Sequence, residues 1–145
     1  YGAKNATNDL LEFIEYECEK EKLTINDVVL IGFSQGAMMS IQAMLLSKNN
    51  FFAILGYSGN ISDQNVDFSR DFIRDGNHKN SKTPVLLIHG EEDEVVPFVS
   101  LENSKKLLLN VGFIVKTLIR PSLGHGIDHE GISAGMEFLK KLVNN

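Results

Sequence analysis

The sequence contains few cysteines, prolines and tryptophans: its 145 residues include one cysteine, Cys18, three prolines and no tryptophan. A lone cysteine excludes an intrachain disulfide and fits a reducing compartment, so we expect a cytoplasmic protein. No apolar run approaches the roughly 20 residues that span a bilayer, so stable membrane insertion is not expected. The formal net charge of −5 disfavours a nucleic-acid partner.

Strand-like and helix-like segments alternate along the chain. Most strand-like segments are short, unbroken apolar runs, which are typical of strands buried on both faces of a parallel sheet. The last one alternates apolar and polar residues, which indicates an edge strand. The predicted strands are 28–32, 52–59, 84–90 and 113–119, and the predicted helices are 3–22, 35–48, 99–110 and 128–143. This order predicts one α/β domain over 1–145, with a mainly parallel sheet and helices on both faces.

Helical periodicity also predicts which side chains face the core. The predicted inward residues are Leu10, Ile14 and Cys18 with Phe13 beside them, then Met38, Ile41 and Leu45, and in the last helix Ile132, Met136, Leu139 and Val143. Gly112 is expected to stop the helix at 99–110. The polar stretch 60–82 is weakly periodic, and we expect a surface excursion with a short helical piece.

A serine stands between two glycines where the first strand meets the second helix. Residues 32–36 read Gly-Phe-Ser-Gln-Gly, the G-x-S-x-G pattern in the strand–turn–helix context of a nucleophile elbow. Such a turn strains the serine backbone, and flanking glycines keep Cβ atoms out of it. It exposes the Ser34 hydroxyl and leaves the Gln35 backbone N–H free to hold an oxyanion. The alternative is a tight turn with a capping serine.

A serine nucleophile needs a base and an orienting carboxylate, which in this architecture follow in the order Ser, Asp or Glu, His. Four acids follow the third strand, namely Glu91, Glu92, Asp93 and Glu94. His125 follows the fourth strand and lies between two glycines. The other histidines suit other roles: His78 a solvated position, His89 a structural hydrogen bond at a strand end, and His129 the start of a helix. Their spacing matches no metal template, so we expect no metal site.

Three motifs in this order, GFSQGA, HGEEDEVVP and GHGID, resemble the phospholipase/carboxylesterase family of α/β-hydrolases. That family includes the acyl-protein thioesterases and bacterial esterases. The resemblance selects Asp93 among the four acids and His125 as the base. It implies a Ser34 hydrolase of small carboxylic esters, thioesters or lysophospholipids, without cofactor. A hydrolase of the same fold that acts on a peptide or lactone bond is an alternative.

The sequence also departs from the family pattern, which places several strands and a His-Gly loop before the helix at 3–22. We therefore expect the C-terminal part of an α/β-hydrolase fold, without the loop that supplies the second oxyanion donor. Losing one donor costs ~3 kcal/mol of transition-state stabilisation, so these residues alone should be a weak esterase. The strand at 28–32 should be an edge that pairs with an upstream strand or, in a homodimer, with a second chain. A non-catalytic or weakly active binding domain is the alternative function.

The acyl pocket has only weak signals in the sequence. Met38, Met39 and the stretch 60–82 are candidates for its lining. Methionines at helical spacing are more often part of a core.

Overall fold

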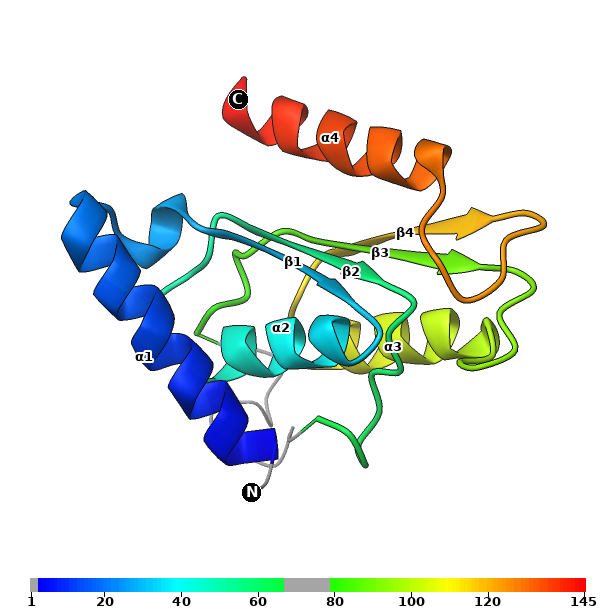
Figure 1. Ribbon diagram of the computed structural model, residues 1–145, viewed down its shortest axis with the longest axis horizontal. Coiled ribbons are helices and arrows are strands. Elements are labelled where there is room, and N and C mark those ends of the chain that lie inside the picture. Colours follow the sequence, from blue (N-terminus) through cyan, green and yellow to red (C-terminus); the bar gives the residue numbers. More distant parts are fainter. Residues whose placement is uncertain (1–2, 67–78) are drawn as a thin grey trace.

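A computed structural model describes residues 3–66 and 79–145 of the chain (Figure 1). Of the excursion predicted over 60–82, residues 67–78 therefore lie outside the described part, together with His78. The predicted helical piece within that segment stays a prediction.

The centre of the fold is a parallel sheet whose strands lie in chain order, β1-β2-β3-β4. The strands are β1 Val29–Phe33, β2 Ala53–Tyr57, β3 Val85–Gly90 and β4 Val115–Arg120. Each strand pairs in parallel with the next one along the chain. The predicted parallel α/β fold is confirmed, and both β1 and β4 are edge strands of the described sheet.

Helices cover both faces of this sheet, as predicted (Figure 1). The α-helices are α1 Ala3–Glu21, α2 Gln35–Leu46, α3 Val99–Asn110 and α4 His129–Val143, and a short 3-10 helix, η1 Ile25–Asp27, leads into β1. In Figure 1, α4 lies alone on one face, and α2 and α3 lie on the other. Gly112 has a φ of 100° just after α3, which confirms its predicted role as the helix stop.

Two hydrophobic clusters fill the space between the sheet and the helices. The larger one joins α1, α2 and α3 to the sheet through buried side chains that include Ile14, Cys18, Ile41, Leu45 and Leu108. The smaller one joins α4 to the other face and includes Leu55, Tyr57, Leu86, Ile88 and Phe138. Apart from Phe13, the predicted inward faces of 3–22 and 35–48 are thus confirmed, with Leu10 and Met38 partly buried against the larger cluster.

The predicted inward face of α4 is wrong in three of its four residues. Ile132, Met136 and Val143 are 53%, 51% and 69% exposed. The helix instead turns Gly131 and Gly135 toward Tyr57, whose hydroxyl donates to the Gly131 carbonyl at 3.0 Å. A Cβ on Gly135 would lie 2.6 Å from that hydroxyl oxygen. Hydropathy periodicity misses this packing because the contact needs the absence of a side chain.

Two further burial predictions are also wrong. Phe13, expected beside the inward stripe of α1, is 60% exposed. The first strand, expected over 28–32 to be buried on both faces, exposes Ile31, and Phe33, with which β1 ends, is exposed as well. In the sheet register these two pair with Leu55 and Tyr57, so they lie on the face that carries α4. Because α4 packs against β3 and β4, it leaves that part of β1 uncovered.

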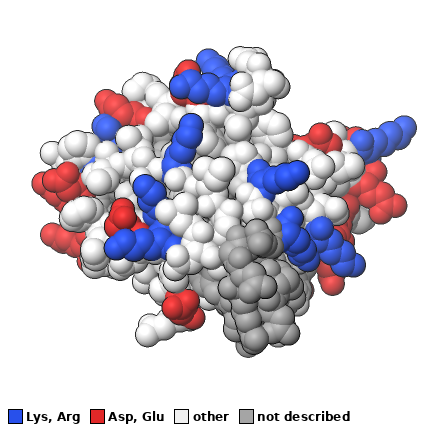
Figure 2. Space-filling model, turned by 180° about the vertical axis from the view of Figure 1, so that it is seen from behind, with Lys and Arg blue, Asp and Glu red and all other residues white. Residues whose placement is uncertain are grey.

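The surface carries charges of both signs without a continuous basic area on the face seen in Figure 2. Lysine and arginine side chains are interspersed there with uncharged and acidic ones. Among the described residues, none of the helices combines the length and the apolar character needed to cross a membrane.

The free edge of β1 leads to the first prediction, which concerns self-association. Strand edges without charge or proline are templates for pairing. If no upstream strand covers this edge, we expect residues 1–145 to associate through β1, and Ile31→Lys to raise the monomer fraction measured by size-exclusion chromatography with light scattering. Ile119→Lys is the matched control, because Ile119 is 43% exposed on β4 at the opposite edge. Equal monomer fractions in the two variants and the wild type would contradict the prediction.

Candidate active site

Three loops meet at the carboxyl edge of the sheet, and each carries one of the side chains selected from the sequence. Ser34 lies in the turn between β1 and α2, Asp93 in the loop after β3, and His125 in the loop between β4 and α4. Parallel strands end at the same edge, which brings residues 91 positions apart in the sequence into contact. His125 Nε2 lies 3.2 Å from Ser34 Oγ, and His125 Nδ1 lies 2.8 Å from Asp93 Oδ2.

Ser34 has the strained backbone expected of a nucleophile elbow. Its φ of 56° and ψ of −115° lie in a region that non-glycine residues rarely adopt. The turn is tight enough that a Cβ on Gly32 would lie 2.2 Å from the Gly36 carbonyl oxygen. The Ser34 N–H donates to the Tyr57 carbonyl at 2.8 Å, which fixes the turn to the neighbouring strand.

Gln35 is the first residue of α2, directly after the serine. Backbone N–H groups in the first turn of a helix have no carbonyl partner within that helix. The positive end of the helix dipole adds to their preference for an anion. The Gln35 N–H therefore has the position and the polarity that an oxyanion donor next to Ser34 requires.

Asp93 is held by backbone groups of its own loop. Its Oδ1 accepts from the N–H groups of Val95 and Val96 at 2.9 and 2.8 Å. Burial acts to raise the pKa of this carboxyl, but the hydrogen bonds from His125, Val96 and Val95 outweigh it, so the pKa is lowered. Asp93 is thus a carboxylate at neutral pH, with Oδ2 directed at His125.

The hydrogen bonds of His125 define its tautomer. Asp93 Oδ2 accepts, so Nδ1 carries the proton, and Nε2 is left with a lone pair toward Ser34 Oγ. This is the form in which an imidazole can take a proton from a hydroxyl.

Sequence analysis missed several residues that hold His125. The Phe33 ring packs against the imidazole with its centroid 4.8 Å away. Ser58 Oγ donates to the Gly126 carbonyl at 3.4 Å. Asp128 caps α4 through Gly131 N–H at 2.8 Å and pairs with Arg120 at 2.9 Å. Only the Asp128 cap had a sequence signal, an aspartate at the start of the helix predicted over 128–143.

Gly90 allows the loops of Asp93 and His125 to approach each other. A Cβ at this position would lie 2.3 Å from the Leu123 carbonyl oxygen and 2.4 Å from that of Gly124. Two backbone hydrogen bonds, both 2.9 Å long, hold the two loops together. They run from Glu91 N–H to Arg120 O and from Glu92 N–H to Leu123 O.

The other acids of this loop and the other described histidines make no hydrogen bond to Ser34 or His125. Glu91, Glu92 and Glu94 are exposed, with no hydrogen bond to His125. His129 is exposed at the start of α4. His89 is buried and lies 2.7 Å from the Val96 carbonyl oxygen, as expected of a structural hydrogen-bonder. Within the described part of the chain, no group of three or more His, Cys, Asp or Glu is placed to hold a metal.

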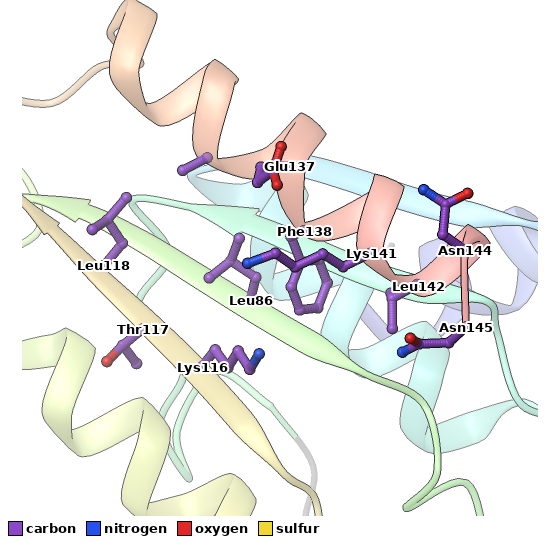
Figure 3. A pocket seen from close by; sticks show the side chains of 11 residues that line it. Leu86, Lys116, Thr117, Leu118, Glu137, Phe138, Lys141, Leu142, Asn144 and Asn145 are labelled. Carbon is purple, nitrogen blue, oxygen red and sulfur yellow. The ribbon is translucent and has the colours of Figure 1, made fainter.

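An open depression of about 740 Å³ adjoins His125. It is lined by Glu91, Glu92, Asp93, Glu94, Val95, Pro97, Phe98, Gly124 and His125. A second groove, of about 600 Å³, lies between α4 and the strands β3 and β4 (Figure 3). Its lining includes Leu86, Lys116, Phe138, Lys141 and Leu142, and it contains none of the three side chains above. Met38, a candidate for an acyl pocket, packs against the larger core cluster.

Comparison with known proteins gives the ancestry of the chain. Residues 1–143 match the family model described as Phospholipase/Carboxylesterase. The chain belongs to the phospholipase/carboxylesterase family.

Relatives within this family cover most of the chain. Acyl-protein thioesterase 1 of Gibberella zeae is 34% identical over 116 residues, which are 79% of this chain and 47% of that protein. Esterase YpfH of Escherichia coli is 25% identical over 92% of this chain and 53% of its own length. The crystal structure of esterase PE8 matches with a TM-score of 0.84 at 33% identity, over 97% of this chain and 62% of that one. The chain thus spans about half the length of these curated relatives.

Gly90 gives a prediction that tests how the site is assembled. Gly90→Ala should lower the free energy of unfolding by about 1–3 kcal/mol, because its Cβ forces the two loops apart. Urea denaturation measures this change. Gly126→Ala is the matched control beside the same histidine, where a Cβ meets nothing within 4 Å. Equal effects of the two substitutions would contradict the prediction.

Asp93 gives a prediction about pH. A lowered pKa in the folded state adds stability that is present above the unfolded value of about 3.9 and is lost as the pH falls through the folded value. Asp93→Asn should therefore be less stable than the wild type at neutral pH, and the gap should narrow in acid. Urea unfolding at neutral pH and at about pH 3 measures the gap. A gap independent of pH would contradict this assignment.

Proposed function

We propose that the chain is the catalytic part of a serine hydrolase that cleaves carboxylic esters or thioesters. The observation that carries the proposal is the continuous hydrogen-bonded line from Ser34 Oγ through His125 to Asp93, with distances of 3.2 and 2.8 Å. Membership of a family whose members include proteins named acyl-protein thioesterase and esterase supports the reaction class.

In the proposed mechanism, Ser34 Oγ attacks the carbonyl carbon of the substrate while His125 Nε2 takes the hydroxyl proton. Asp93 keeps the imidazole in its tautomer and stabilises the imidazolium. The Gln35 N–H donates to the oxyanion. The imidazolium then gives its proton to the leaving alcohol or thiol, and an acyl-enzyme remains. Water, deprotonated by His125, releases the acid and restores Ser34.

The proposed substrates are small acyl esters, thioesters or lysophospholipids, and no metal or cofactor takes part. The lining of the depression beside His125 includes exposed apolar side chains, Val95 and Phe98, as well as carboxylates. A free, buried Cys18 supports a reducing compartment, and we propose a cytoplasmic location.

The test combines labelling with turnover. Mass spectrometry after fluorophosphonate treatment should find the adduct on Ser34. Ser34→Ala, His125→Ala and Asp93→Asn should each lower ester hydrolysis by about 10⁴-fold, because each removes one member of the unit. Glu92→Gln and His129→Ala are the controls, since both residues are exposed and outside the hydrogen-bonded line.

Two outcomes would reject the proposal. If His125→Ala kept near-normal turnover while His129→Ala abolished it, the base is misassigned. If a folded chain neither reacted at Ser34 nor hydrolysed esters, the alternative of a non-catalytic binding domain on a hydrolase scaffold would be favoured.

A further inference from the structure

His89 is a buried histidine that takes no part in the proposed reaction. It lies in β3, an inner strand of the sheet, and its side chain is 1% exposed. Its Nε2 lies 2.7 Å from the Val96 carbonyl oxygen and 3.4 Å from Asp93 Oδ2. A buried imidazole costs free energy unless it is hydrogen-bonded, and here its polar atom is directed at the loop that carries Asp93.

The partners of His89 define the direction of its hydrogen bond. A carbonyl oxygen can only accept, so Nε2 carries a proton and donates it to Val96 O. The same N–H lies near Asp93 Oδ2, a second and more distant acceptor. His89 is therefore a donor toward this loop, unlike His125, whose Nε2 accepts.

Val96 is held from both sides by this arrangement. Its N–H donates to Asp93 Oδ1 at 2.8 Å, and its carbonyl accepts from His89 at 2.7 Å. The Asp93 carboxylate can rotate only if its Oδ1 gives up this N–H and that of Val95, which donates at 2.9 Å. With Oδ1 held in this way, Oδ2 is the oxygen that faces His125 Nδ1 at 2.8 Å.

The geometry points to His89 as a positioning residue for Asp93. Its Nε2–H anchors Val96, and Val96 fixes the carboxylate in the orientation in which Oδ2 accepts from His125. The catalytic consequence rests on the proposed function, whereas the orientation of the carboxylate does not. Supporting residues of this kind matter because a displacement of about 1 Å at a reacting group can cost about 100-fold in rate.

Two substitutions of similar length distinguish the effect of losing the hydrogen-bond donor at position 89 from the effect of changing the size of the side chain. Gln at position 89 keeps an N–H near the place of Nε2, and Met does not. In His89→Met the Val96 carbonyl loses its partner, which loosens one of the two N–H groups that hold Asp93 Oδ1, so the hydrogen bond from His125 to Oδ2 weakens. In His89→Gln this bond should persist.

The experiment has a spectroscopic and a chemical readout. The first is the downfield proton resonance of the hydrogen-bonded His125 Nδ1–H in the NMR spectrum. The second is the rate of Ser34 labelling by a fluorophosphonate. We expect His89→Met to lose the resonance and to react about ten- to 100-fold more slowly, and His89→Gln to keep the resonance and most of the rate. His129→Gln is the control, because it removes an exposed histidine.

Urea unfolding of each variant shows whether the readouts come from folded protein. If folded His89→Met and His89→Gln match each other in both readouts, the positioning role is overturned. If His89→Met does not fold, His89→Asn takes its place, because the shorter amide of asparagine does not reach Val96 O. Equal readouts in His89→Asn and His89→Gln then overturn the positioning role. If the wild type shows the resonance but Ser34 is not labelled, the proposed function is rejected. The resonance in the variants then decides by itself whether His89 orients Asp93.

Discussion

The hydrogen bond between Asp93 Oδ2 and His125 Nδ1, 2.8 Å long, joins the loops that follow β3 and β4, and the site depends on it. The carboxylate accepts hydrogen bonds from the backbone of its own loop, and His89 Nε2 lies 3.4 Å from its Oδ2. It also sets the tautomer that lets His125 Nε2 accept from Ser34. The buried Asp93 carboxylate thus links its own loop to the loop of His125, and His125 in turn reaches the turn that carries Ser34.

The second constraint is that other atoms come very close to the backbone at three positions, and each of these positions is a glycine. Gly32 admits the first turn of α2, Gly90 admits the loop of His125, and Gly135 admits the hydroxyl of Tyr57. At each position a Cβ would lie within 2.6 Å of another atom. Two of these contacts shape the site directly, and the third seats α4, the helix that begins just after the His125 loop.

Much of the fold could be predicted from the sequence, because the signals were local. Unbroken apolar runs predicted the first three described strands within a few residues, alternation predicted the fourth, and the 3.6-residue period predicted the four α-helices. The burial of individual faces was harder to predict. Ile31, Ile132 and Met136 are exposed because α4 packs through glycines and over only part of the sheet. Whether a face is covered depends on another element, and its own periodicity does not report this.

For the candidate site, the order of its residues along the chain determined which were selected: a serine in a strand-to-helix turn, then an acid and a histidine after later strands. The sequence by itself left four acids in one loop, and the family resemblance favoured one of them. Only the tertiary structure decided that Asp93 is buried against His125 while its three acidic neighbours face solvent, and that His89 is hydrogen-bonded to the Val96 carbonyl of the same loop. The physical reason is that a hydrogen bond requires atoms about 3 Å apart. Separations of 32 and 91 residues are closed only by the parallel strand order of the sheet.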